Sequence, residues 1–154
     1  MISIRAIIPA DAAKVTEHRH RMFVDAGKPD DAKLRAMSTA FQAWLEPRLQ
    51  SGEYFGWFAE EGGQVVSGLG MMTLPWPPHP LHLEPMRGYI LNVYTEASHR
   101  GRGLAKELTE RAMQEARIRK LSLTILHATE MGKPLYAKLG FKTTNEMQWV
   151  KPDD

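Results

Sequence analysis

The chain has 154 residues, 43% of them hydrophobic and 25% charged, and its 20 Lys and Arg against 18 Asp and Glu leave a formal net charge of +2. These values predict a single globular domain over residues 1–154, and the near-balanced charge argues against a nucleic-acid partner, which needs a clustered basic face. The lack of cysteine excludes disulfides, thiolate zinc sites and cysteine nucleophiles, so any thiol must come from a cofactor. The lack of a long apolar run or signal-peptide pattern predicts a cytoplasmic protein without membrane contact.

The first fifty residues predict one strand and two helices. Alternating apolar side chains predict a strand over residues 2–8, which ends at Pro9. Apolar residues at helical spacing then predict a helix that stops at Gly27 and a second that starts at Asp30 or Asp31. The second helix carries an apolar stripe made of Leu34, Met37, Phe41, Trp44, Leu45 and Leu49.

A hairpin and a proline-rich loop follow these helices. Residues 54–59 and 64–74 predict two strands, and the tight turn between them makes the pair antiparallel. The stretch Pro75–Pro80 predicts a loop, because proline has no N–H to donate to a strand ladder. A loop of this length often carries functional residues.

The next segment predicts a strand, a helix and a second strand. Residues 87–95 and 121–126 have strand patterns, and residues 103–119 between them form an amphipathic helix. The apolar face of this helix repeats every four residues, at Leu104, Leu108, Ala112 and Ala116. A crossover helix of this length predicts that the two flanking strands run parallel, so the whole chain is a mixed α/β protein.

The chain closes with one short helix and two strand patterns. Residues 131–139 predict a helix ended by Gly140. Residues 141–143 and 145–150 have the alternation of strands and predict the last two strands of the sheet.

The glycine-rich turn between residue 95 and the long helix has the chemistry of an anion site. Backbone N–H groups at a helix start have no intrahelical partner, and the helix dipole places partial positive charge there. Gly101 and Gly103 allow a ligand to approach the backbone closely, while Arg100 and Arg102 add positive charge. The turn lacks the residues that define the P-loop and the dinucleotide-binding fingerprint, because Lys106 is not followed by Ser or Thr and is not glycine.

Two sequence blocks and the opening of the chain point to a known family. The turn reads Arg100-Gly101-Arg102-Gly103-Leu104-Ala105, and a later block reads Leu135-Tyr136-Ala137-Lys138-Leu139-Gly140-Phe141. Together with Ile4-Arg5, Pro9 and Asp11 near the start, these blocks resemble the GCN5-related N-acetyltransferase (GNAT) superfamily. The turn matches the family signature Arg/Gln-x-x-Gly-x-Gly/Ala at every fixed position, and the later block resembles the family's Tyr-x-x-x-Gly-Phe ending.

The resemblance implies a mixed, mainly antiparallel seven-stranded sheet flanked by about four helices, in which strands four and five splay apart to admit acetyl-CoA. The splay would begin at a bulge in the fourth strand, around Asn92–Tyr94. The backbone of Val93, Tyr94 and Thr95 would pair with the pantetheine arm of the cofactor. The N–H groups from Arg100 to Ala105 would hold its pyrophosphate, and one near Val93 or Tyr94 would face the thioester oxygen.

The resemblance also assigns roles to Tyr136 and Thr129. Tyr136 aligns with the tyrosine that protonates the departing CoA thiolate in many relatives, and a phenol with a pKa near 10 is suited to that task. The alternative is a tyrosine with a structural role in its helix. Thr129 stands where many relatives carry an asparagine that contacts the cofactor, and its hydroxyl can make one of those hydrogen bonds.

No carboxylate lies inside the fourth predicted strand to act as a general base. The remaining candidates are peripheral, and the sequence does not choose among them: His79, His82, Glu84, Glu96 and Glu146. No metal is expected, because His18 and His20 point in different directions on a helix and His79 and His82 lack a third ligand nearby.

The resulting hypothesis is an acetyl-CoA-dependent N-acetyltransferase that moves an acetyl group to a primary amine by direct attack in a ternary complex. The acceptor, a small molecule or peptide, would lie between the first two helices and the loop at Trp76, and its identity stays open. A non-catalytic acyl-CoA sensor is the alternative, and a homodimer is compatible with the resemblance.

Overall fold

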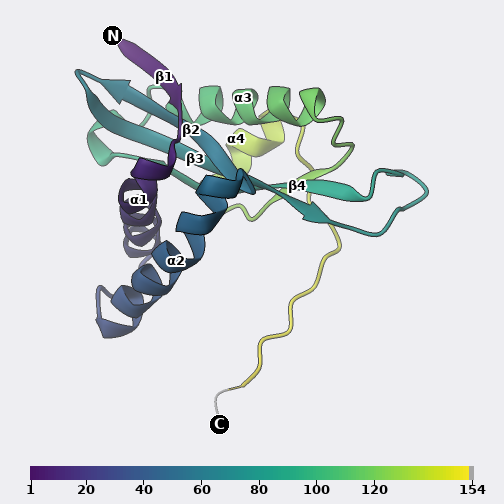
Figure 1. Cartoon of the computed structure of the whole chain (residues 1–154), viewed down its shortest axis with the longest axis horizontal. Coiled ribbons are helices and arrows are strands. Elements are labelled where there is room, and N and C mark those ends of the chain that lie inside the picture. Colours follow the sequence, from purple (N-terminus) through teal and green to yellow (C-terminus); the bar gives the residue numbers. More distant parts are fainter. Residues whose placement is uncertain (153–154) are drawn as a thin grey trace.

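The computed structural model of the protein describes residues 1–152 and is built on a five-stranded sheet (Figure 1). The strands lie in chain order and have these bounds: β1 Ile2–Ala6, β2 Tyr54–Glu61, β3 Gln64–Pro75, β4 Met86–Thr95 and β5 Thr124–Leu126. Neighbouring strands from β1 to β4 are antiparallel, and β5 runs parallel to β4, as the crossover helix predicts.

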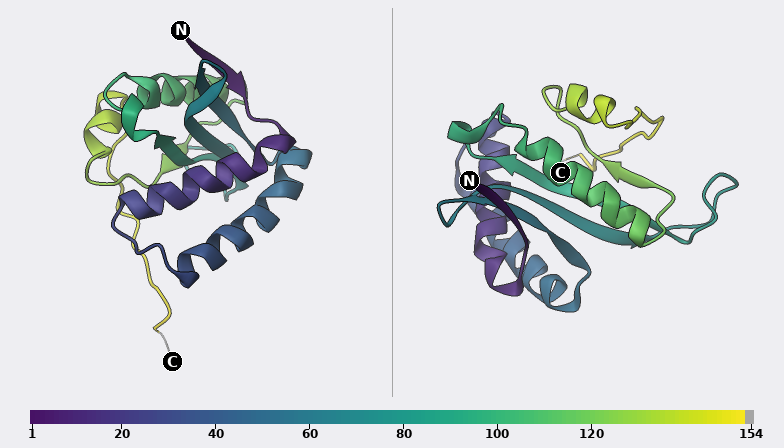
Figure 2. Two further views of the ribbon diagram at one scale, coloured as in Figure 1. Left: turned by 90° about the vertical axis from the view of Figure 1, so that its left-hand side faces the viewer. Right: turned by 90° about the horizontal axis from the view of Figure 1, so that it is seen from above.

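The helices cover both faces of the sheet. Their bounds are α1 Ala12–Asp25, α2 Ala32–Ser51, α3 Leu104–Ile118 and α4 Lys133–Lys138, and two short 3₁₀ turns lie at Pro9–Asp11 and Ala97–His99. Figure 2 shows α1 and α2 on one face of the sheet and α3 on the other. None of the helices in the described chain is long and apolar enough to cross a bilayer.

Each face of the sheet has its own apolar core. Between the sheet and α1 and α2, the most buried side chains are Val15, Leu45, Tyr54 and Phe58. Between the sheet and α3 they are Leu69, Met71, Ile90, Leu108 and Ala112. Burying one large apolar side chain contributes roughly 1.5–3 kcal/mol, so these two layers fix how the helices sit on the strands.

The prediction of seven strands is wrong. Residues 141–143 and 145–150 form no strand, residues 141–152 have no regular structure, and the end of the described chain extends away from the body of the protein (Figure 1). A strand needs a ladder partner for its backbone groups, and within residues 1–152 this segment finds none.

The junction of β4 and β5 also differs in detail from the expected splay. β5 has three residues rather than the six of the predicted strand 121–126, and they pair with Gly88–Ile90. The rest of β4 has no neighbour on that side within the described chain. The opening is therefore the end of a short ladder rather than the parting of two long strands.

Candidate functional site

A bulge in β4 marks the start of the candidate site. Gly68 pairs with Tyr94 and Gly70 pairs with Leu91, so β4 has one residue more than β3 over this stretch. The extra residue lies at Asn92–Val93, and Asn92 has a left-handed backbone with φ of 55°. The bulge predicted around residues 92–94 is thus present.

The bulge changes the direction of the backbone groups that follow it. The N–H of Glu96 donates to the carbonyl of Val66 on β3 at 2.9 Å. Because direction alternates along a strand, Tyr94 also faces β3, while Val93 and Thr95 point to the opposite edge. β5 does not reach that edge, which leaves it open for an added strand-like ligand.

The turn that follows β4 has the expected geometry of an anion site. Gly101 and Gly103 have φ of 75° and 81°, a conformation that costs glycine little, and α3 begins directly afterwards at Leu104. No side chain caps the start of α3, so its first N–H groups face outward with the positive end of the helix dipole. The space beside both glycines is open, since a Cβ built on either meets no atom within 4 Å.

The two arginines of this turn are held by carboxylates. Arg100 donates to the carbonyl oxygen of Thr95 at 3.0 Å and forms an ion pair with Asp25 at the end of α1. Arg102 donates to both oxygens of Glu61 at 2.7 and 3.0 Å, and His99 lies 3.0 Å from the same carboxylate. These hydrogen bonds lower the pKa of Glu61 to about 2.

The arginine side chains therefore tie the turn to α1 and to the β2–β3 hairpin. Both are exposed, so each ion pair adds little stability by itself. Their effect is to hold the shape of residues 100–103, which fixes the direction of the backbone N–H groups in this turn.

Tyr136 and Thr129 lie in the segment that follows β5. Tyr136 is half-buried on α4, its ring packs edge-on against Phe141 with centroids 5.8 Å apart, and burial raises the pKa of its hydroxyl. Its hydroxyl makes no hydrogen bond with any residue between 1 and 152. Thr129 accepts a hydrogen bond from the N–H of Gly132 at 3.1 Å, which leaves its hydroxyl hydrogen available.

The structure brings most of the predicted residues together, but not all of them. Val93, Tyr94 and Thr95 run directly into the turn 100–105 along one edge. Tyr136 lines a hollow of about 1270 Å³ bounded by α3, β5, α4 and the final segment. Within the described chain, no hydrogen bond joins Tyr136 or Thr129 to residues 93–105.

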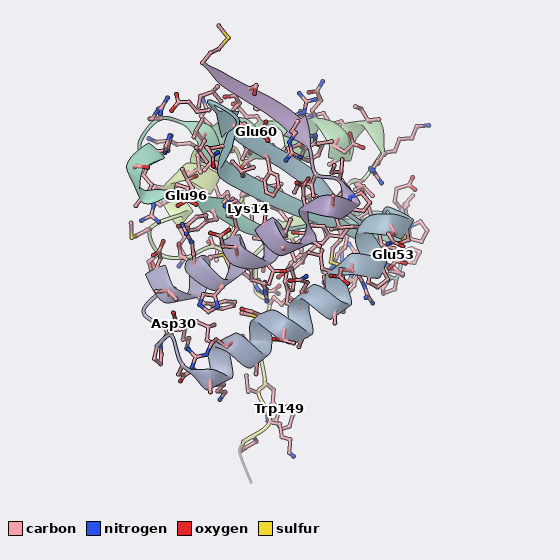
Figure 3. All side chains as sticks on the ribbon, turned by 60° about the vertical axis from the view of Figure 1, so that its left-hand side comes forward. Lys14, Asp30, Glu53, Glu60, Glu96 and Trp149 are labelled. Carbon is pink, nitrogen blue, oxygen red and sulfur yellow. The ribbon has the colours of Figure 1, made fainter. Side chains whose placement is uncertain are left out.

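The candidate general bases are scattered. His79 and His82 face each other through backbone hydrogen bonds of 3.0 and 2.8 Å in the loop between β3 and β4, which projects from the body (Figure 2). Glu96, labelled in Figure 3, follows β4, and its carboxylate accepts a hydrogen bond from Arg21 at 2.7 Å. Glu146 is exposed on the final segment. No three His, Asp or Glu side chains gather as a metal would require within residues 1–152.

One polar network at the bulge was missed by sequence reasoning. The side-chain amide of Asn92 donates to the hydroxyl of Tyr54 at 2.9 Å and accepts from Arg19 at 2.7 Å. The available signal was a cation at position 19 within an otherwise apolar helical pattern that includes Val15, Met22 and Phe23.

An open strand edge that leads into an uncapped helix start defines a protein that can hold an extended, phosphate-bearing ligand. A family model described as Acetyltransferase (GNAT) domain matches residues 3–144. The chain belongs to this family of acetyltransferase domains.

Solved structures support the same assignment. A GCN5-related N-acetyltransferase from Ralstonia eutropha JMP134 is 46% identical, with a TM-score of 0.94 over 98% of this chain and 99% of that one. A predicted acetyltransferase from Clostridium acetobutylicum, solved with acetyl-CoA, is 27% identical, with a TM-score of 0.89 over 98% and 96% of the two chains.

Mouse N-acetyltransferase 8B is 34% identical over 93 residues, which are 58% of this chain. The matched region spans 38% of the length of the mouse protein.

Proposed function

We propose that acetyl-CoA binds along the open edge of β4, with its pyrophosphate at the start of α3. The observation that carries this proposal is the continuity of the unpaired edge at 93–95 with the open glycine turn at 100–103. The pantetheine arm would pair with Val93 and Thr95, as an added strand does. The residues proposed to contact the cofactor are Val93, Tyr94, Thr95, Arg100, Gly101, Arg102, Gly103, Leu104, Ala105 and Thr129.

The proposed reaction is direct attack of a primary amine on the thioester in a ternary complex. The nitrogen forms a bond to the acetyl carbon, the carbon–sulfur bond breaks, and the amine gives its proton to solvent. Negative charge that grows on the thioester oxygen is stabilised by the N–H of Val93, because that of Tyr94 faces β3. Tyr136 gives its proton to the departing thiolate and regains one from solvent.

An assay of free CoA thiol separates this enzyme from the alternative, an acyl-CoA sensor. Incubation with acetyl-CoA and a pool of primary amines is expected to release CoA faster than incubation without amines. A sensor would bind acetyl-CoA and release none. Family membership supports the enzyme, and it also supports treating residues 1–154 as one acetyltransferase domain, because the family match extends over 3–144.

Acetyl-CoA is expected to stabilise the folded protein. A ligand at about 100 times its dissociation constant adds roughly 2.7 kcal/mol, which raises the melting temperature of a chain this size by about 5–10 °C. Thermal unfolding across an acetyl-CoA titration measures this shift. Pantetheine, which lacks the pyrophosphate, serves as the control and should shift the melting temperature much less; equal shifts would place the pyrophosphate elsewhere.

We further propose a homodimer in which the final segment of each copy adds a strand to β5 of the other. Met147, Trp149 and Val150 are 94%, 81% and 68% exposed, and Figure 3 shows Trp149 beyond α2, away from the body. β5 is an edge strand with an unpaired outer side, and the 1270 Å³ hollow lies beside it. The strand pattern of residues 141–150 therefore suits a partner in a second copy.

Light scattering tests this arrangement. The unaltered protein is expected at twice the mass of one chain, and Trp149→Asp is expected to shift it toward one chain at micromolar concentration, because a charged side chain would replace the indole that is proposed to pack against the second copy. Leu81→Asp is the matched control, since Leu81 is 78% exposed on the projecting loop. A monomeric unaltered protein would refute the homodimer.

A further inference from the structure

The guanidinium of Arg19 places a positive charge at the bulge of β4. Its Nη1 donates to the side-chain oxygen of Asn92 at 2.7 Å, and its guanidinium lies 5.1 Å from the ring of Phe23 and 4.8 Å from the ring of Phe41. These three contacts come from β4, α1 and α2, so they fix the guanidinium where all three elements meet. Asn92 directly precedes Val93, whose N–H is proposed to face the thioester.

The charge of Arg19 is not balanced by a carboxylate. No Asp or Glu among residues 1–152 lies within 4.0 Å of its guanidinium, and its Nε is buried without a hydrogen-bond acceptor. Its Nη2 also donates to no described residue. Burial lowers the pKa of Arg19, as expected for a cation removed from water without a counter-ion.

The neighbouring arginine on the same helix shows the contrast. Arg21 bonds to Glu17 at 2.8 Å and to Glu96 at 2.7 Å, and its side chain is far more open to solvent. Arg19 is half-buried and has no carboxylate partner in the described chain, whereas Arg21 is exposed and pairs with two carboxylates. This contrast indicates that the guanidinium of Arg19 is available to bind an anionic group of a ligand.

The position of this cation restricts the amines that can react. A primary amine arrives largely as an ammonium ion at neutral pH, and it must lose one proton to solvent before its nitrogen can attack the thioester beside Val93. A second positive charge at Arg19 opposes the arrival of a simple amine or a polyamine. An acceptor that carries an anionic group near its amine is attracted to Arg19, which offsets the repulsion between the two positive charges. The anionic group can also accept hydrogen bonds from guanidinium N–H groups that have no partner among the described residues.

We propose that Arg19 binds a carboxylate of the acceptor, so that the preferred acceptors are amino carboxylates. This inference rests on the proposed acetyl transfer beside Val93 and names the acceptor class for that site. A guanidinium favours a planar carboxylate, because its donors match the two oxygens of that group.

Paired acceptors test the proposal directly. The kcat/KM of acetyl transfer is measured for a panel of amino acids, each beside the amide of the same amino acid, which keeps the amine and removes the carboxylate. The unaltered protein is expected to favour the acids at least tenfold, the effect of about one charge-assisted hydrogen bond. The amine of an amino-acid amide has a lower pKa than the amine of the acid, so more of it is in the reactive neutral form at neutral pH. Amine reactivity alone would therefore favour the amides, and a preference for the acids would have to come from the carboxylate.

Arg19→Met keeps an unbranched side chain against Phe23 and Phe41 and removes the charge. Its expected effect is a rise of about tenfold in KM for the acids, while the amides are used as well as before or better, because the repulsion of their ammonium form is removed, and acetyl-CoA affinity is nearly unchanged. Arg19→Lys should restore part of the preference. Arg21→Met is the matched control on α1 and should leave the preference intact.

Two outcomes would overturn the proposal. One is equal use of acids and amides by the unaltered protein; the other is an equal loss of both in Arg19→Met, which a structural role would give. If acetyl-CoA raises the melting temperature yet no panel member is acetylated, the acceptor class is refuted while the cofactor proposal stands. If acetyl-CoA itself fails to bind, the proposed function fails first.

Discussion

Replacement of Gly103 by Val is expected to weaken acetyl-CoA binding by about 10²-fold or more. Gly103 has a φ of 81° at the start of α3, and a Cβ there would meet no protein atom within 4 Å. The added side chain would therefore project into the space proposed for the pyrophosphate. The loss of two charge-assisted hydrogen bonds, each worth about 1.5–3 kcal/mol, accounts for an effect of this size.

Gly52→Val is the matched control for this variant. Gly52 has a φ of 79° and the same open surroundings, so both replacements impose similar backbone strain, about 1–2 kcal/mol. Gly52 precedes β2 at the end of the sheet opposite to Thr95, as the pairing of Tyr54 with Met72 and of Met72 with Tyr89 shows. Calorimetric titration should find normal affinity in Gly52→Val; unchanged affinity in Gly103→Val would remove the pyrophosphate from this turn.

The glycine turn could be predicted from sequence because its chemistry is local. Residues 100–105 supply the positive φ values, the uncapped N–H groups and the helix start within six consecutive positions. The bulge at Asn92 is likewise a property of one short segment. What sequence did not show is that Arg100 and Arg102 are held by Asp25 and Glu61, which come from distant parts of the chain.

The network around Arg19 could not be predicted for the same reason. Arg19 and Asn92 are 73 positions apart, and Asn92 and Tyr54 are 38 apart, so their contact depends on how α1 packs against β4 and on the positions of β2 and β4 on either side of β3. A cation within an apolar stripe shows that a charge will be partly buried, but it does not show which group it will meet.

The prediction of two further strands was wrong for a different physical reason. Alternating side chains over 141–143 and 145–150 show that the segment can form a ladder, but a ladder also needs an unpaired edge beside it. The sequence pattern of a strand is the same whether the strand pairs with an edge of its own chain or with an edge of a second copy, so the pattern does not show which edge it uses. A homodimer with exchanged segments would satisfy the pattern without a sixth or seventh strand inside one chain.

Tyr136→Phe is expected to lower kcat by about 10²-fold, the lower end of the usual contribution of acid–base catalysis, with little change in acetyl-CoA affinity. The hydroxyl of Tyr136 has no hydrogen-bond partner in the described chain, so its removal leaves no buried group unsatisfied. The phenylalanine ring keeps the edge-on contact with Phe141. The melting temperature should therefore hardly change.

Burial raises the pKa of Tyr136, so its hydroxyl keeps its proton throughout the neutral range, as a general acid requires. The same shift makes transfer of that proton to a new thiolate more costly, so the assignment rests on the effect to be measured when the hydroxyl is removed. Tyr89→Phe is the comparison variant, because Tyr89 is also half-buried but its hydroxyl already lies 3.1 Å from Nδ1 of His127. Single-turnover rates, cofactor affinity and melting temperature measured on each preparation separate chemistry from folding. Tyr89→Phe is expected to keep a nearly normal rate. If Tyr136→Phe also kept a nearly normal rate, another group or water would have to protonate the thiolate.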